Sequence, residues 1–188
     1  MRRSMITMLT ALAGLSTPLA AQATRGAWTL GFAGTLGGGW QVEAADVGYA
    51  RAVRAGPVAV ASLTARLGSF IDEGAIVGGA RGFVFGVTLA GRTPMAHLAD
   101  LGADTAGSQL GLDLTLEATG YAGSRTPLPV GSPWGALALL PGLRFGDPNG
   151  GQLGLLLGPT VFFGEVTEVR GFVGLRFEAP LARRERHP

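Results

Sequence analysis

Residues Leu110 to Ala118 read Leu-Gly-Leu-Asp-Leu-Thr-Leu-Glu-Ala, so every second residue is apolar. The residues between the leucines are Gly111, Asp113, Thr115 and Glu117. A β-strand points successive side chains to opposite faces, which gives this segment one apolar face and one polar face. A helix would place the same leucines all round its surface. The segment therefore predicts a strand that has one face against an apolar environment.

The same alternation recurs along the chain and predicts eight strands in all. They are Ala27–Leu36, Gly39–Arg51, Val58–Leu67, Gly82–Ala90, Leu110–Tyr121, Trp134–Phe145, Gln152–Phe163 and Thr167–Phe177. Each reaches or approaches the roughly 9–11 residues that a transmembrane strand needs, and turn residues such as Gly37-Gly38 separate them. We expect an all-β, eight-stranded antiparallel up-and-down transmembrane barrel. In the long connection 91–107, we expect Pro94–Leu101 to form one or two helical turns.

The N-terminus has the three parts of a secretory signal peptide. Met1-Arg2-Arg3 is followed by a largely apolar run and by Ala21-Gln22-Ala23, a small-x-small cleavage site. We therefore expect residues 1–23 to be a signal peptide, 24–177 a barrel domain and 178–188 a polar C-terminal tail. The signal contains two of the 15 basic residues, so the remaining 13 balance the 13 acidic ones. This balance argues against nucleic acid as a partner.

The composition is unusual for a soluble enzyme and suits a membrane barrel. The chain is 47% hydrophobic and 15% charged, and 32 of its 188 residues are Gly. A soluble domain has about 25% charged residues and about 7% Gly. Lipid around the barrel accommodates the apolar side chains, and small residues suit a narrow interior.

The charged residues of the predicted strands gather on the polar faces, which would line the barrel lumen. Eight strands enclose a space that side chains just fill, so charges there must pair with one another. The predicted lumen charge network consists of Glu43, Asp46, Arg66, Asp113, Glu117, Arg144, Arg170 and Arg176. Glu43 and Asp46 cannot share a face in an unbroken strand, so we expect a β-bulge near Ala44-Ala45. For Asp113 and Glu117, Arg144 is the favoured partner by strand adjacency, whereas Arg66 would have to reach across the lumen.

Aromatic residues fall near the ends of the predicted strands. One set comprises Trp28, Tyr49, Phe145 and Phe177, and the other Trp40, Phe70, Tyr121, Trp134 and Phe163. Tyr and Trp concentrate at membrane–water interfaces, where one end of the side chain is apolar and the other is wet. We therefore expect both sets to form girdles on the outer surface, and the alternative is a chance distribution with some of these rings packed in the core.

Taken together, residues 26–177 resemble the small eight-stranded outer-membrane barrels, the group of the OmpA transmembrane domain and OmpX-like proteins. The last predicted strand has Val169, Gly171, Val173, Leu175 and Phe177 at alternate positions and ends in an aromatic. This pattern looks like the signal read by the outer-membrane assembly machinery. The chain departs from the family in continuing beyond Phe177. The resemblance implies an architecture and a location, and no motif narrows it further.

The chain offers little for catalysis or metal binding. It has no Cys, and its two histidines are His97, in the long connection, and His187, in the tail. No His–carboxylate cluster has metal-ligand spacing, and no nucleotide-binding or nucleophile motif is present. Barrel enzymes that modify lipopolysaccharide carry a His on the barrel wall, and no His falls in a predicted strand. We expect no catalytic residue, no metal and no cofactor.

The leading hypothesis is a non-enzymatic barrel of the bacterial outer membrane that contributes to envelope structure or surface interaction. Its expected partners are outer-membrane lipid and the assembly machinery. An extracellular ligand, which the sequence does not identify, would contact the loops Ser69–Arg81 and Ala122–Ser132. Two alternatives stay open: a soluble periplasmic lipocalin-like barrel that binds a small apolar ligand, and a narrow pore. In the lipocalin-like case, leucines would face inward and charges outward.

Overall fold

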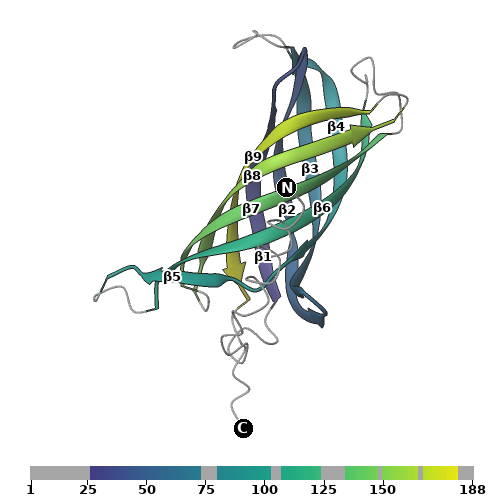
Figure 1. Ribbon diagram of the computed structural model, residues 1–188. Helices are drawn as coiled ribbons and strands as arrows, with labels where there is room; N and C mark the ends of the chain where they lie inside the picture. Colours follow the sequence, from purple (N-terminus) through teal and green to yellow (C-terminus); the bar gives the residue numbers. More distant parts are fainter. Residues whose placement is uncertain are drawn as a thin grey trace, which may run out of the picture.

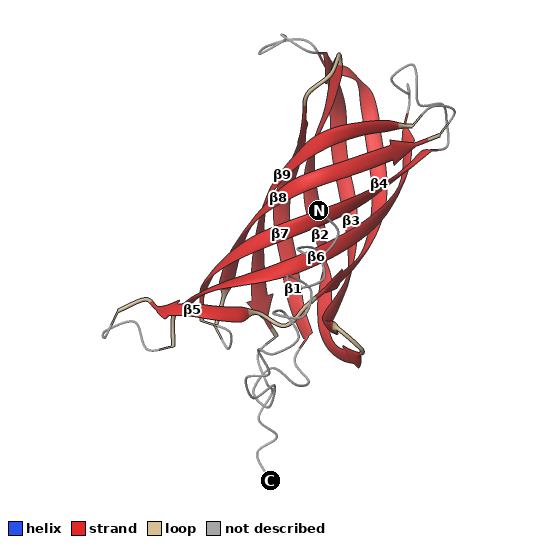
Figure 2. Cartoon of the chain, viewed as in Figure 1, coloured by secondary structure: helices blue, strands red, loops and turns tan. Residues whose placement is uncertain are grey.

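The computed structural model describes residues 26–72, 80–102, 107–123, 134–147, 150–164 and 167–181. Within these ranges the chain forms one closed antiparallel β-barrel (Figures 1 and 2). The strands are β1 (Gly26–Leu36), β2 (Trp40–Ala55), β3 (Val58–Asp72), β4 (Ala80–Arg92), β5 (Ala96–Asp100), β6 (Gln109–Gly123), β7 (Trp134–Gly146), β8 (Gln152–Phe163) and β9 (Glu168–Pro180). In the described part of the chain, no helix is long and apolar enough to cross a membrane.

Eight of these strands, all except β5, make the barrel wall. β1 pairs with both β2 and β9, and the barrel is closed by the pairing of β4 with β6. The remaining strand, β5, pairs with β6 from Ala96↔Leu112 to Asp100↔Gln109, where β6 has left β4. The resulting β5–β6 hairpin projects sideways from one end of the barrel (Figure 1).

The eight predicted strands match the eight wall strands to within a few residues at most ends. The largest differences lie at the ends of β2, β3 and β9. β9 continues to Pro180, so residues 178–180, expected to start the polar tail, belong to the barrel. The expected helical turn at Pro94–Leu101 is wrong, because Ala96–Asp100 form β5. The expected signal peptide, residues 1–23, lies outside the described residues, as do positions 182–188 of the tail.

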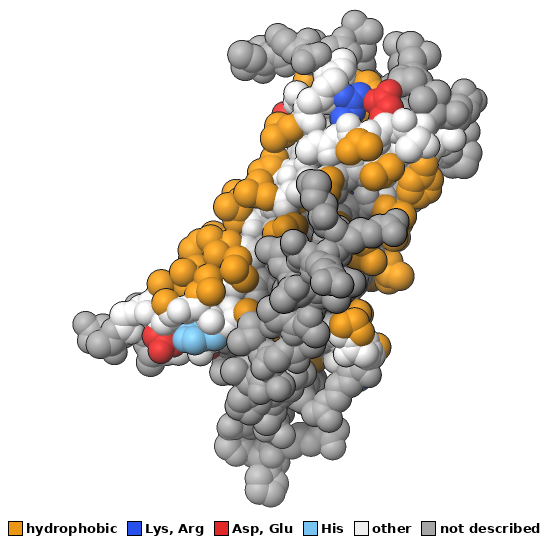
Figure 3. Space-filling model, viewed as in Figure 1, with side chains coloured by type: hydrophobic (Ala, Val, Ile, Leu, Met, Phe, Trp, Pro, Cys, Tyr) orange, Lys and Arg blue, Asp and Glu red, His pale blue; other side chains and the backbone are white. Residues whose placement is uncertain are grey.

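Alternate side chains of each wall strand point outward and into the lumen. The outward set is largely apolar and exposed, with Phe32 at 71%, Leu116 at 55% and Leu139 at 46%. Figure 3 shows apolar side chains along the wall between the two ends, with the charged side chains in view lying near those ends. The apolar face predicted from Leu110–Ala118 thus faces outward, with Asp113 and Glu117 on the inner face.

The connections differ between the two ends. At one end the tight turn Gly37–Gly39 joins β1 to β2, and both Gly37 (φ 87°) and Gly38 (φ 80°) adopt the left-handed conformation that favours glycine. The C-terminal ends of β3, β6 and β8 lie at this same end (Figure 1). The opposite end carries the beginning of β1, the end of β9 and the β5–β6 hairpin. We call the first the turn end and the second the terminal end.

Five aromatic side chains fill the lumen at the turn end, and we call this cluster the aromatic plug. It consists of Trp40, Phe70, Tyr121, Trp134 and Phe162. The rings of Tyr121 and Trp134 are stacked, with centroids 4.2 Å apart. The predicted girdle at this end is therefore wrong for four of its five members, because Trp40, Phe70, Tyr121 and Trp134 occupy inward positions. At the terminal end the prediction holds better: Trp28, Tyr49 and Phe177 are exposed on the outer surface.

Candidate functional site: the charged lumen

The first group of lumen charges, the Arg66 network, comprises Asp46, Arg66, Glu117 and Arg176. Arg66 Nε donates to Asp46 Oδ1 at 2.8 Å and Arg66 Nη2 donates to Asp46 Oδ2 at 2.9 Å, a bidentate pair between neighbouring strands. The same Nη2 lies 3.3 Å from Glu117 Oε2, across the lumen. Arg176 Nη2 donates to Glu117 Oε1 at 2.7 Å. Each of these side chains is no more than 6% exposed.

The second group, the Arg144 network, lies toward the terminal end and comprises Arg92, Asp113, Arg144 and Glu178. Arg144 Nε donates to Asp113 Oδ2 at 2.7 Å, and Arg144 Nη1 donates to Glu178 Oε1 at 2.8 Å. Arg92 donates to both oxygens of Glu178, at 2.9 and 3.1 Å. The Asp113 carboxylate also lies 3.6 Å from Arg92 Nε. Asp113 and Glu178 therefore each bridge the same two guanidinium groups, those of Arg92 and Arg144.

Both networks are electrically neutral, because each contains two arginines and two acids. Burying a charge is expensive unless an opposite charge and hydrogen bonds compensate it. A narrow barrel cannot offer bulk water to eight ionised groups, so this balance is the condition under which they can occupy the lumen. The bidentate Arg–carboxylate geometry also fixes the relative positions of the strands that carry the partners.

Glycines beside the Arg144 network make room for its large side chains. Gly154 of β8 faces Arg144 across the strand pair, and a Cβ atom there would lie 2.9 Å from Arg144 Nη1. Gly142 of β7 lies opposite Asp113 in the register, and a Cβ atom there would collide with Asp113 Oδ1. The high glycine content is thus explained in part by the inner face, where small residues alternate with long charged ones.

A third charged pair lies beside the aromatic plug. Arg170 forms an ion pair with Glu168 and donates a hydrogen bond to the backbone oxygen of Gly37. Its guanidinium carbon lies 4.6 Å from the centroid of the Trp40 ring, within the range of a cation–π interaction. Arg170 therefore links the plug to the β1–β2 turn.

Seven of the eight residues predicted to line the lumen are buried inside it. Asp46, Arg66, Asp113, Glu117, Arg144 and Arg176 belong to the two networks, and Arg170 lies beside the plug. The prediction is wrong for Glu43. β2 pairs with β1 in unbroken register through Ala44 and Ala45, so the expected bulge is absent and the Glu43 side chain is exposed on the outer surface.

Sequence reasoning missed several members of the networks. Arg92 and Glu178 fall just beyond the strand ends predicted at Ala90 and Phe177. Both nevertheless stand at the alternate positions whose side chains point into the lumen. Extending the alternation by a few residues would have found them. Tyr121, expected in a girdle, accepts a 2.9 Å hydrogen bond from Arg66 Nη1. Its inward orientation could have been read from Glu117 and Thr119, the two preceding alternate positions of the same strand.

The favoured partner of Asp113 is confirmed: it is Arg144, on the adjacent strand. Glu117 instead contacts Arg66 and Arg176, so the pairing across the lumen also occurs. His97 lies in β5 outside the lumen, with its Nε2 3.6 Å from Asp100 Oδ1. Among the described residues, no group of three or more His, Cys, Asp or Glu side chains could hold a metal ion.

The two loops expected to contact an extracellular ligand fall largely outside the described residues, which omit 73–79 and 124–133. Of these loops, Ser69–Asp72 belong to β3, Ala80 and Arg81 to β4, and Ala122 and Gly123 to β6.

Comparison with protein-family models, curated proteins and solved structures finds no significant match to this chain. The architecture is nevertheless that of a small eight-stranded antiparallel barrel, as the sequence predicts. The lumen holds two neutral ion-pair networks, the aromatic plug at the turn end and a further apolar cluster that includes Leu140, Leu156 and Phe172. These buried side chains fill the space that the wall strands enclose.

Proposed function

We propose that this chain is a non-enzymatic β-barrel of the bacterial outer membrane, with a filled lumen, that contributes to envelope structure or surface interaction. The observation that carries the proposal is the orientation of the wall. Exposed leucine, valine and phenylalanine side chains cover the outside, whereas the two ion-pair networks lie inside. Water around such a barrel would leave an apolar surface of unusual extent, whereas lipid would match it.

The dimensions of the wall support the same location. The eight wall strands have 11 to 16 residues, against the roughly 9–11 that a tilted transmembrane strand needs. Exposed Trp28 and Tyr49 pack edge to face at the terminal end, with ring centroids 6.1 Å apart. Amphipathic rings at the end of an apolar wall are typical of a membrane interface.

The last strand supports assembly by the outer-membrane machinery. Val169, Leu175 and Phe177 are exposed on the outer surface, and they alternate with buried Arg170, Phe172 and Arg176. The proposed partners are therefore this machinery and the surrounding lipid, after export directed by residues 1–23. We place the terminal end in the periplasm, because a cleaved signal leaves the start of β1 there.

The orientation of the side chains disfavours the soluble lipocalin-like alternative, which requires leucines inside and charges outside. The filled lumen disfavours the narrow pore. The aromatic plug occupies one end, and Leu140, Leu156 and Phe172 form a further buried cluster between the strands. Eight-stranded barrels of this diameter hold side chains in place of an aqueous channel.

Membrane fractionation tests the proposal. The full-length gene is expressed in a Gram-negative host, and the envelope is separated on a sucrose gradient. We expect the protein in the outer-membrane fraction, with a mature N-terminus at Thr24 and a mobility on SDS gels that shifts on boiling. Recovery in the soluble periplasmic fraction, without a heat-dependent shift, would instead favour the lipocalin-like barrel.

A further inference from the structure

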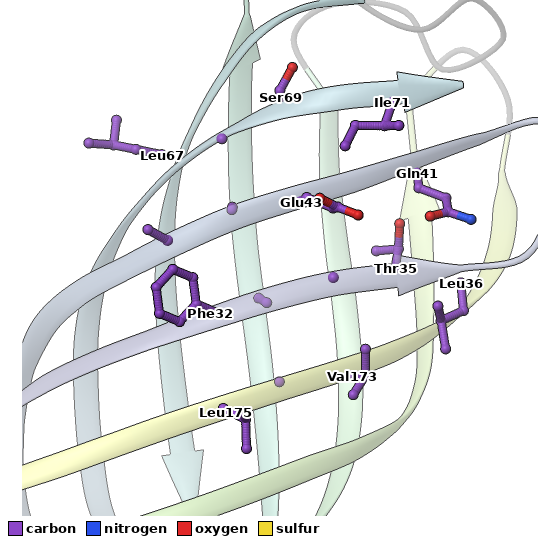
Figure 4. Close-up of a pocket in the computed structure, with 16 residues that line it drawn as sticks. Phe32, Thr35, Leu36, Gln41, Glu43, Leu67, Ser69, Ile71, Val173 and Leu175 are labelled. Atoms are coloured by element: carbon purple, nitrogen blue, oxygen red, sulfur yellow. The ribbon is translucent and has the colours of Figure 1, made fainter. Parts of the chain in front are cut away.

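The outer wall carries a groove of about 540 Å³ where β9, β1, β2 and β3 lie side by side (Figure 4). Apolar side chains form most of its lining: Phe32, Leu36, Leu67, Ile71, Val173 and Leu175. The backbone at Gly34, with no side chain on the outward face, leaves the centre of the groove open. Glu43 lies in this groove. On β2 it stands opposite Gly34 of β1 on one side and opposite Ser69 of β3 on the other.

The Glu43 carboxylate is exposed and has no hydrogen-bond or ion-pair partner among the described residues. The neighbouring Ser69 hydroxyl is already engaged, because it donates to the backbone oxygen of Gly82 at 2.9 Å. Glu43 is thus unlike the lumen acids, each of which contacts at least one arginine. Its charge is available to a group outside the chain.

Apolar residues flank Glu43 on both sides along the strands. Leu36 and Ile71 lie closer to the turn end, whereas Phe32 and Leu67 lie closer to the middle of the barrel. The carboxylate is therefore set within the apolar wall and not beyond its edge. An ionisable side chain on a lipid-facing surface is costly, which makes a partner of opposite charge favourable there.

We propose that this groove binds a membrane lipid whose head group carries a primary ammonium, a proposal that rests on the membrane location proposed above. Glu43 accepts hydrogen bonds from the ammonium, and the Gln41 amide lies beside it toward the turn end. The acyl chain follows the apolar side of the groove, over Phe32, Leu67 and Leu175. Glu43 and Gln41 supply the polar groups of the groove, and the apolar lining continues from them toward the middle of the barrel, which matches the direction of a lipid in the leaflet at the turn end.

A second copy of the chain fits the groove less well. The chain has no Lys. Among the side chains that the structure describes, the exposed outward arginine is Arg51, eight residues from Glu43 on the same strand. At 3.3 Å per residue this separation is roughly 26 Å. Two copies inserted in the same direction would therefore keep Arg51 of one far from Glu43 of the other.

Native mass spectrometry of the full mature chain, released from micelles, tests the proposal. The probes are phosphatidylethanolamine and phosphatidylcholine with identical acyl chains. Both carry the same net charge, but the trimethylammonium of choline has no N–H to donate. We expect the wild type to retain the ethanolamine lipid about fivefold more than the choline lipid, as one charge-assisted hydrogen bond allows.

The decisive variant is Glu43→Gln, and Arg51→Gln is the control for loss of an outward charge. Glu43→Gln should abolish the preference between the two lipids, whereas Arg51→Gln should preserve it. Equal retention of both lipids by the wild type, an unchanged preference in Glu43→Gln, or a dimer that Glu43→Gln dissociates would overturn the proposal. A heat-dependent gel shift in phosphatidylcholine vesicles tests insertion separately, so failure of the lipid site leaves the membrane location standing.

Discussion

Arg144 Nε lies 2.7 Å from Asp113 Oδ2, and both side chains are only 1% exposed. The two residues belong to adjacent strands, and Glu178 and Arg92 complete a neutral group around them. A buried group of this kind depends on every member, because removing either Arg144 or Asp113 would leave it with one uncompensated charge.

This dependence predicts the outcome of a double-mutant cycle. Arg144→Met and Asp113→Asn should each lower the free energy of unfolding by about 3–5 kcal/mol. The double variant should lose less than the sum of the two, with a coupling of about 1–3 kcal/mol. Urea unfolding in lipid vesicles measures all four proteins. A coupling near zero in folded, inserted variants would show that water solvates the two charges and that the lumen is wider than described.

The outward face predicts a second result. Leu116 is 55% exposed near the middle of β6, on the face that we place against lipid. Leu116→Arg should lower the free energy of unfolding in bilayers by about 2–4 kcal/mol and reduce insertion, whereas the control Leu116→Val should have a small effect. Equal folding yields for the two variants in vesicles would contradict a lipid-facing position.

Much of the fold could be predicted from the sequence because one physical rule governs every wall strand. An apolar outer face and a polar inner face make the side chains of each strand alternate, so the inward orientation of Asp113 or Arg144 can be read from its apolar neighbours. Glu43 breaks that rule. The bulge predicted near Ala44-Ala45 rested on every strand charge lying inside, and the register of β2 is unbroken there.

The aromatic residues show a different limit of the sequence argument. Trp40 and Trp134 lie near strand ends, which favours a girdle. Their places in the alternation of β2 and β7, however, put both side chains on the inner face. The short strand β5 was also missed, because it is stabilised by pairing with β6 and carries no alternation of its own. The predicted strand ends at Ala90 and Phe177 stop short of Arg92 and Glu178, whose side chains continue the lumen face.

The glycines of the inner face predict a third result. Gly154→Ala should lower the free energy of unfolding by about 1–3 kcal/mol, because Arg144, held by two carboxylates, cannot move away from the new methyl group. Gly120 of β6 is the matched control, since a Cβ atom there would have no neighbour within 4 Å. Gly120→Ala should be neutral or slightly stabilising. The same loss in both variants would mean that strand propensity, and not the Arg144 contact, decides the cost.

The filled lumen predicts the behaviour of the protein in planar bilayers. Purified full-length protein should insert without a steady ion conductance, because the aromatic plug and the two networks occupy the lumen. A barrel with an open pore, reconstituted in the same bilayer, serves as the positive control. Stable unitary conductance from the wild type would contradict the filled lumen and favour the pore.

The three tryptophans allow the most direct measurement of the central claim, that the apolar outside of the barrel faces lipid. Trp28 is exposed on the outer surface, whereas Trp40 and Trp134 are buried in the plug. Trp40→Phe/Trp134→Phe leaves Trp28 as the single reporter, and Trp28→Phe/Trp40→Phe leaves Trp134. In vesicles of brominated lipid, Trp28 fluorescence should be strongly quenched and Trp134 fluorescence much less, with little quenching of either by aqueous acrylamide. If acrylamide quenches Trp28 in the folded barrel and brominated lipid does not, the outside of the barrel faces water and the account is contradicted.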